Sequence, residues 1–290
     1  MAIPQQPVSL SLRILGTSRF YSVPYLTAAS LGILLATTPT PSARSLLVVL
    51  ALPACFAVGV AAWNDLAHRK ADQRSGRRAS DQQLLIRLGT SGSLAALGLA
   101  LLGGLGTLLG VSASLLSGVG YAFSKSLPLV ANLVRGLTTL TLLLGFATLE
   151  GQIEAALPLA LGFALLDSAG NIWGDVRDVT VDQRAGTHTI ATRSPLGTIV
   201  AAYLLHGVAV VLLAQASPWL WTSYVLSFGL LFVPNYAKHE RFLQLKYLTT
   251  VLLGLSFANH LLSSLLVLFL GGLVVPATML YRKLHLAPTT

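Results

Sequence analysis

The chain has 290 residues, of which 54% are hydrophobic and 10% are charged, and its mean hydropathy is +0.72. A soluble domain carries about 25% charged residues, so the composition excludes an ordinary soluble protein and predicts an integral membrane protein. The formal net charge of +9 does not call for a nucleic-acid partner, because the loop positions of the basic residues account for it.

Ten apolar runs are long enough, or nearly long enough, to cross a bilayer as helices. They fall at residues 21–39, 45–64, 84–107, 111–124, 132–149, 155–171, 196–214, 218–236, 243–260 and 261–281. The boundary near Asn259-His260 is weak, so nine helices remain an alternative. We therefore expect an all-α integral membrane protein, a bundle of nine to ten transmembrane helices that forms one membrane domain over residues 1–290.

The basic residues alternate with the apolar runs in a way that indicates orientation. With the N-terminus in the cytoplasm, all but one of the 19 Lys and Arg residues fall on the cytoplasmic side, and only Arg44 falls opposite. Cytoplasmic loops carry such an excess of positive charge. The count places Arg135 and Lys246 near cytoplasmic helix ends, and it favours ten helices because Arg282 and Lys283 then lie inside.

Two acidic stretches close apolar runs and are versions of each other. The first reads Asn64-Asp65-Leu66-Ala67-His68-Arg69-Lys70-Ala71-Asp72-Gln73-Arg74-Ser75-Gly76, and the second reads Asp175-Val176-Arg177-Asp178-Val179-Thr180-Val181-Asp182-Gln183-Arg184-Ala185-Gly186. Positions i, i+3 and i+7 fall within about a 60° arc of a helix, and carboxylates so placed repel unless a cation neutralises them. The repeat predicts two parallel half-bundles, whose motifs form a divalent-metal site for a polyanion near the cytoplasmic face.

These motifs resemble those of the UbiA superfamily of membrane prenyltransferases, whose first motif is N-D-x-x-D-x-x-x-D and whose second is D-x-x-D-x-x-x-D. Asn64, Asp65 and Asp72 match the first motif, and Asp175, Asp178 and Asp182 match the second. The segment Tyr121-Ala122-Phe123-Ser124-Lys125 matches a Y-x-x-x-K motif, and Arg77 occupies the arginine position five residues after Asp72. The resemblance extends over residues 19–259.

The resemblance implies a helical bundle around a central cavity that binds an isoprenyl diphosphate through Mg²⁺. It also implies transfer of the isoprenyl group to a lipophilic acceptor, such as an aromatic compound, a quinone precursor or a lipid. The residues that it implies for the metal are Asn64, Asp65, Asp72, Asp175, Asp178 and Asp182, and those for the diphosphate are Arg77, Tyr121, Lys125 and Arg184. The five aspartates, Tyr121 and Lys125 make up the expected catalytic set, in which Tyr121 orients the diphosphate or faces the allylic cation.

The chain departs from the family pattern at His68, which stands where the central acid of the first motif is expected. A neutral imidazole is a poor ligand for Mg²⁺, so the first metal site loses a ligand there or is completed by water. Alternatively, a protonated His68 contacts the diphosphate directly. A third interpretation is that the first site has decayed.

Two polar residues precede the second motif within the same apolar run, Asp167 and Asn171. Ionisable groups inside a membrane usually face a cavity, so both are candidates to line an acceptor pocket; a buried hydrogen bond between helices is the alternative. Two other functions also remain open. A UbiA-type terpene cyclase would act on the diphosphate without an acceptor, and a non-enzymatic transporter would use the parallel halves.

Overall fold

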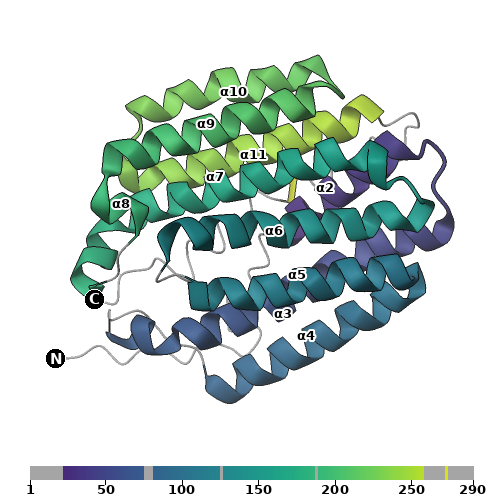
Figure 1. Cartoon of the computed structure of the whole chain (residues 1–290), viewed down its shortest axis with the longest axis horizontal. Helices are drawn as coiled ribbons and strands as arrows, with labels where there is room; N and C mark the ends of the chain where they lie inside the picture. The colour runs from purple at the N-terminus through teal and green to yellow at the C-terminus, as the bar shows by residue number, and fades with distance from the viewer. Residues whose placement is uncertain (1–21, 75–80, 125–126, 187–188, 258–271, 274–290) are drawn as a thin grey trace.

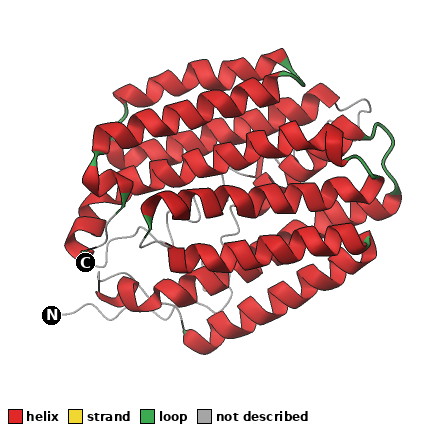
Figure 2. Ribbon diagram, viewed as in Figure 1, coloured by secondary structure: helices red, strands yellow, loops and turns green. Residues whose placement is uncertain are grey.

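The computed structural model describes residues 22–74, 81–124, 127–186, 189–257 and 272–273, apart from some side chains near the breaks. Within these ranges the chain is helical and contains no strand (Figure 2). In chain order the α-helices are α2 (Ser22–Thr37), α3 (Ala43–Arg74), α4 (Gln82–Gly103), α5 (Leu105–Ser124), α6 (Pro128–Ala147), α7 (Ile153–Ala185), α8 (Ile190–Arg193), α9 (Pro195–Ala214), α10 (Trp221–Ser227) and α11 (Asn235–Phe257). Short 3₁₀ helices lie at η1 (Thr148–Glu150), η2 (Pro218–Leu220) and η3 (Phe228–Phe232).

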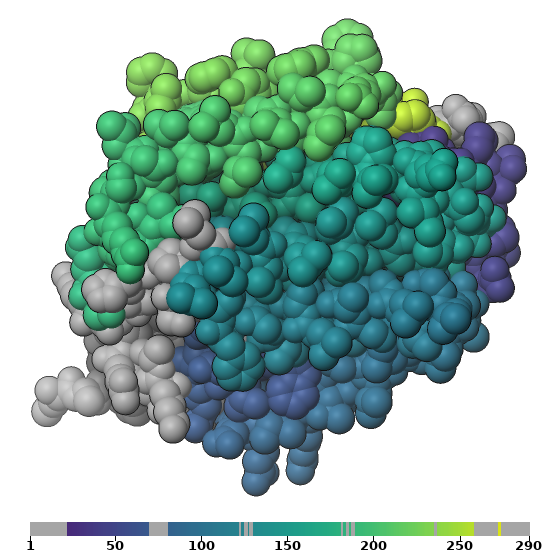
Figure 3. All heavy atoms as spheres, viewed as in Figure 1, coloured from purple at the N-terminus to yellow at the C-terminus, as the bar shows by residue number. Residues whose placement is uncertain are grey.

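The long helices lie side by side, with their axes roughly along the longest axis of the molecule (Figure 1). Helices that follow one another in sequence pack together, as α3 does with α4, α5 with α6, and α7 with α9. Helix α11 closes the arrangement by packing on both α2 and α7. In the space-filling view, helices from both halves of the chain form one continuous surface (Figure 3).

The lengths and surfaces of the helices fit a multi-pass membrane protein. Five described helices are long and apolar enough to cross a membrane, at Ala43–Arg69, Gln82–Gly103, Val130–Glu150, Ile153–Thr180 and Pro195–Ala214; the apolar helices Ser22–Thr37 and Leu105–Tyr121 are shorter. Large leucines such as Leu94, Leu116 and Leu204 are exposed on their outer faces, where lipid would solvate them. The all-helical membrane fold is confirmed, whereas the number of nine to ten spans is not, because residues 261–281 lie almost wholly outside the described ranges.

The helices at the predicted runs 45–64 and 155–171 extend well beyond the predicted ends, as α3 and α7. Helix α3 has 32 residues and α7 has 33, so at 1.5 Å per residue each is about 50 Å long, against a hydrocarbon core of about 30 Å. Both helices therefore continue through the acidic motifs beyond the length that a membrane needs. The central cavity implied by the family resemblance stays a prediction.

Glycine and proline explain where other runs differ from the prediction. The run at 84–107 is broken at Gly104, which adopts a left-handed φ of 99° and separates α4 from α5. The run at 218–236 forms η2, α10 and η3 instead of one α-helix, and it ends at Val233 in an extended conformation. Pro234 follows, and proline disfavours a helical conformation in the residue before it.

Close helix contacts depend on glycines that face one another. A Cβ at Gly92 in α4 would lie 2.6 Å from the backbone nitrogen of Gly59 and 2.9 Å from the carbonyl oxygen of Cys55 in α3. Backbone atoms cannot move aside as a side chain can, so any larger residue separates the two helices. Small residues at such positions are typical of helix packing in membranes.

We expect Gly92→Leu to destabilise the protein by about 1–3 kcal/mol or more, because it overpacks a backbone contact. Gly98→Leu in the same helix is the matched control, since a Cβ there meets nothing within 4 Å. The thermal unfolding midpoint of both variants in one detergent tests the expectation. Equal midpoints for the two variants would show that α3 and α4 do not pack through Gly92.

Candidate active site

The two acidic motifs lie at the same end of the bundle. At the opposite end, the backbone N–H of Ser42 donates to Glu150 Oε1 over 2.9 Å, so the chain segments that precede α3 and α7 meet there. Helices α3 and α7 therefore start together and run in the same direction, as the repeat predicts, and Figure 1 shows them ending at the same side of the molecule. Their C-terminal turns carry the two motifs.

The first motif occupies the last turns of α3. Asn64 is 3% exposed, and its Oδ1 atom has no hydrogen-bond partner in the described part of the chain. Asp65 and His68 are half-buried on the following turn. A buried carbonyl oxygen without a donor is uncommon in proteins, and it is the type of atom that a hard cation binds. The side chain of Asp72 lies outside the described residues.

The second motif occupies the last turns of α7, which ends at a glycine of the repeated pattern. Gly186 has a left-handed φ of 68°, and its N–H donates to the carbonyl oxygens of Asp182 and Gln183. This arrangement terminates the helix at no steric cost to a side chain. Asp175, Asp178 and Asp182 are half-buried on the turns before it.

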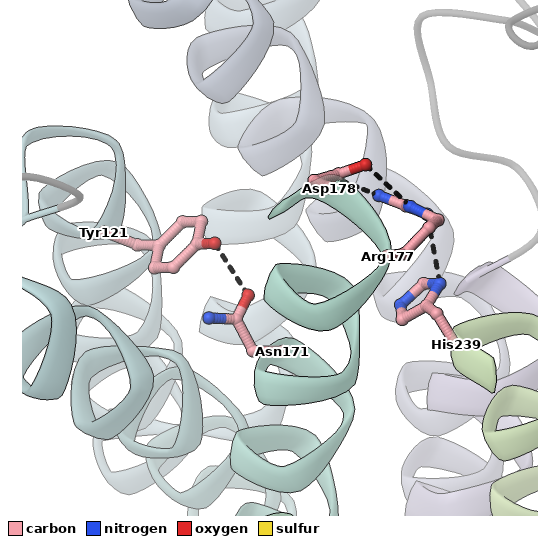
Figure 4. A network of polar contacts seen from close by, with 5 residues as sticks. All are labelled: Tyr121, Asn171, Arg177, Asp178 and His239. Atoms are coloured by element: carbon pink, nitrogen blue, oxygen red, sulfur yellow. Dashed lines mark hydrogen bonds and ion pairs between the residues drawn. The ribbon is translucent and has the colours of Figure 1, made fainter. Parts of the chain in front are cut away.

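Asp178 is held by an arginine that the sequence analysis did not single out. Arg177 donates from Nη2 to Asp178 Oδ2 over 2.6 Å and from Nε to Oδ1 over 2.9 Å. Its Nη1 atom lies 3.1 Å from His239 Nδ1 on α11, and Figure 4 shows Arg177 between the other two residues. The paired contact fixes both oxygens of the carboxylate, and the histidine ties the motif to α11.

The described carboxylates do not form a compact metal cage. In the ranges that the structure covers, no group of three or more His, Cys, Asp or Glu side chains is close enough to hold a metal ion. Magnesium does not require such a cage, since it usually keeps several waters and binds through one or two carboxylates and the substrate's phosphates. The oxygen-donor set of the two motifs is therefore chemically suited to Mg²⁺.

Tyr121 on α5 points toward Asn171 on α7 (Figure 4), and Asn171 precedes Asp175 by four residues, about one helical turn. The Tyr121 hydroxyl donates to Asn171 Oδ1 over 2.6 Å. Asn171 Nδ2 donates in turn to Asn132 Oδ1 on α6, and Ser168 Oγ donates to the Asn132 carbonyl over 3.0 Å. This chain of hydrogen bonds joins α5, α6 and α7 and fixes the Tyr121 side chain.

Asp167 and Asn171 both make contacts between helices, a buried one for Asp167 and half-buried ones for Asn171, and their role in lining an acceptor pocket stays a prediction. Asp167 is 3% exposed, accepts from the Thr139 hydroxyl and forms an ion pair with Lys246. This pair corrects the placement of Lys246 near a cytoplasmic helix end: Lys246 lies within α11, and its side chain is 8% exposed and reaches Asp167 on α7. An acid on a neighbouring helix compensates its charge, so it does not need water.

Several predicted residues fall outside what the structure describes. Arg77 and Lys125 lie in the undescribed segments, and the Arg184 side chain is likewise not described. Their roles stay predictions. Sequence reasoning missed Arg177 and His239: Arg177 stands inside the second motif, whereas His239 gives no spacing signal because its contact is 62 residues away in sequence.

Solved structures share this fold at low sequence identity. An apo UbiA homolog from Aeropyrum pernix K1 has a TM-score of 0.60 and 19% identity, and the match covers 94% of this chain and 100% of that chain. A UbiA homolog from Archaeoglobus fulgidus bound to DMAPP and Mg²⁺ has a TM-score of 0.60 and 14% identity, with coverage of 93% and 99%. A digeranylgeranylglyceryl phosphate synthase has a TM-score of 0.59 and 13% identity, with coverage of 94% and 95%.

Family membership follows from sequence. No curated protein sequence matches the chain. The UbiA prenyltransferase family matches residues 25–246, which is more than three quarters of the chain and includes both acidic motifs and Tyr121. The chain belongs to the UbiA prenyltransferase family.

Proposed function

We propose that the protein is an intramembrane prenyltransferase that moves an isoprenyl group from an isoprenyl diphosphate to a lipophilic acceptor with the help of Mg²⁺. The observation that supports the proposal is the position of the two acidic motifs at the same end of the bundle, on parallel helices longer than a membrane requires. Archaeoglobus UbiA homologs bound to DMAPP or GPP with Mg²⁺ support it by analogy. We place this end at the cytoplasmic face, as the basic residues predict.

The metal would be held by the oxygen atoms of the two motifs. Asp65 and Asp72 on α3 and the acids of the second motif supply carboxylates, and the buried Asn64 Oδ1 supplies an oxygen that the described protein leaves without a donor. Bound Mg²⁺ would neutralise the negative charge that develops on the departing diphosphate. Arg77, Lys125 and Arg184 would bind the diphosphate oxygens.

The described residues would hold the side chains of the site in place and exclude water from the reacting groups. Arg177 holds both oxygens of Asp178, and Asn171 holds Tyr121 one turn inward. Farther inward the bundle contains buried aromatic side chains such as Phe163, whose ring lies against that of Tyr25. An allylic cation is quenched by water, so an apolar interior next to the diphosphate favours transfer of the isoprenyl group.

The proposal is tested by incubating the purified protein with C10 to C20 allylic diphosphates and Mg²⁺, with and without acceptors. Diphosphate release and a prenylated acceptor are expected. We expect Asp175→Asn to reduce release about 10²-fold or more, because diphosphate charge is then left uncompensated. Glu154→Gln is the matched control, since this exposed acid lies in the first turn of the same helix.

Three results would contradict parts of the proposal. Near-normal turnover by Asp175→Asn would refute the role of the second motif. Cyclic or rearranged products from the donor alone would indicate a terpene cyclase. If no donor gives diphosphate release, the protein is not an active prenyltransferase, and the result would favour a transporter or an enzyme with a decayed site.

His68 offers a separate prediction because it replaces an expected acid. It lies one turn after Asp65 on the same face of α3, so His68→Asp would restore a third carboxylate. We expect tighter apparent Mg²⁺ affinity and an unchanged or faster rate of diphosphate release. A titration of release against Mg²⁺ in wild type and variant measures this. Weaker Mg²⁺ affinity or a slower rate in the variant would show that the imidazole contacts the diphosphate instead.

A further inference from the structure

Helix α11 packs along α7 in the antiparallel direction, and one of its faces brings a histidine close to the second acidic motif. Successive contacts, from the interior toward the motif, join Lys246 to Asp167, Phe242 to Gly170 and His239 to Gly174. Residues at i, i+3 and i+7 share one face of a helix, so the three side chains of α11 form one row. A Cβ at Gly174 would lie 3.6 Å from Cδ2 of His239 and 3.7 Å from its Nε2. The imidazole ring therefore lies beside the α7 backbone, about one turn before Asp178.

The ion pair of the second motif joins two residues that are adjacent in the chain. Arg177 donates from Nε and Nη2 to the two carboxylate oxygens of Asp178, over 2.9 Å and 2.6 Å. Adjacent side chains on an α-helix point about 100° apart and do not face each other. The guanidinium therefore has to turn along the helix surface to reach Asp178, so a group outside α7 that holds it in this orientation stabilises the pair.

His239 on α11 supplies such a contact. Its Nδ1 atom lies 3.1 Å from Nη1 of Arg177, and Figure 4 shows the imidazole on the side of the guanidinium away from Asp178. An arginine side chain has donors only, so Nδ1 accepts this hydrogen bond and the imidazole carries its proton on Nε2. With Nη1 engaged by His239, the Nε and Nη2 atoms are directed at Asp178.

Helix packing alone does not account for a hydrogen-bond acceptor at this position. Lys246 pairs with Asp167 and so joins α11 to α7 deeper in the bundle. Between that pair and the motif, the rings of Phe242 and Trp173 pack together with their centroids 6.2 Å apart. An apolar side chain at position 239 would continue this packing against the α7 backbone, but it could not direct a lone pair at Arg177. The acceptor therefore acts on the guanidinium, and through it on the motif.

We propose that His239 is a positioning residue of the metal site, which raises the affinity of the site for Mg²⁺ by holding Arg177 against Asp178. The inference rests on the proposed function, in which Asp178 is a metal ligand. The paired contact engages one lone pair of each carboxylate oxygen, and a carboxylate has about four such sites. The contact therefore fixes the plane of the Asp178 carboxylate and is compatible with metal binding by the same oxygens. Removal of groups that orient a metal ligand in this way typically lowers metal affinity about 10–100-fold.

The test measures the Mg²⁺ concentration that gives half-maximal binding of geranyl thiodiphosphate to the full-length protein in nanodiscs. His239→Leu removes the acceptor without changing the charge of the site, and about tenfold more Mg²⁺ should then be needed. His239→Asn has nearly the same shape as His239→Leu, but its Oδ1 atom stands where Nδ1 stood, so its Mg²⁺ dependence should stay close to that of the wild type. With a donor that is turned over, the rate of diphosphate release at saturating Mg²⁺ should be unchanged in both variants.

Further variants separate positioning from packing. Gln244→Leu is the matched control, because this neutral side chain lies on the other side of α11 and accepts from Arg241 of the same helix over 3.0 Å; its Mg²⁺ dependence should be that of the wild type. If His239→Leu does not fold, His239→Phe replaces it, since it keeps a ring beside Gly174 without an acceptor. The decisive comparison repeats His239→Leu in an Arg177→Met background. If His239 acts through Arg177, it should cost no further Mg²⁺ affinity there.

Failure of this inference is distinct from failure of the proposed function. Three results with a wild type that binds the analogue in a Mg²⁺-dependent manner overturn the role of His239 alone. They are an unchanged Mg²⁺ dependence in His239→Leu, equal losses in His239→Leu and His239→Asn, and an equal loss from His239→Leu with and without Arg177. If the wild type shows no Mg²⁺-dependent binding, the proposed metal and diphosphate site is refuted, and the role of His239 is refuted with it.

Discussion

A charged side chain inside a hydrocarbon layer persists only where another group compensates its charge, and α7 meets this constraint along one face. The polar residues of this face are Asp167, Asn171, Asp175, Asp178 and Asp182, which fall within about an 80° arc at 3.6 residues per turn. The basic residue that compensates the charge of each aspartate differs with depth in the bundle. Lys246 pairs with Asp167 inside the bundle, whereas Arg177 pairs with Asp178 near the helix end. The neighbouring helices are arranged around this face.

The position of the candidate site follows from helix direction and close packing. Helices α3 and α7 start near each other, as the contact between Ser42 and Glu150 shows, and they run in the same direction, so their acidic C-terminal turns lie at the same end of the bundle (Figure 1). Glycine contacts such as Gly92 of α4 against Gly59 of α3 let the backbones of neighbouring helices approach closely. A repeated motif in two parallel helices thus becomes one candidate site for a metal and a diphosphate.

The sequence predicts features that depend on local pattern. Apolar runs locate the helices, and the spacing of Asp175, Asp178 and Asp182 places them on one face of α7. Prediction from sequence fails where the environment of a residue depends on a partner that is distant in the sequence. The sequence places Lys246 near a cytoplasmic helix end, because only the fold shows Asp167 beside it. His239 gives no signal for the same reason, since its contact with Arg177 depends on how α11 packs against α7.

The central claim is that both acidic motifs serve one site, and calorimetry tests it directly. Geranyl thiodiphosphate, which resists ionisation, is titrated into wild type, Asp65→Asn, Asp175→Asn and the double variant, with and without Mg²⁺. One shared site predicts Mg²⁺-dependent binding of a single ligand. Each single substitution should weaken the binding of the diphosphate. The double variant should lose clearly less binding free energy than the two single variants lose together, because the two carboxylates are coupled. Binding without Mg²⁺, or losses that add independently, would contradict a shared site.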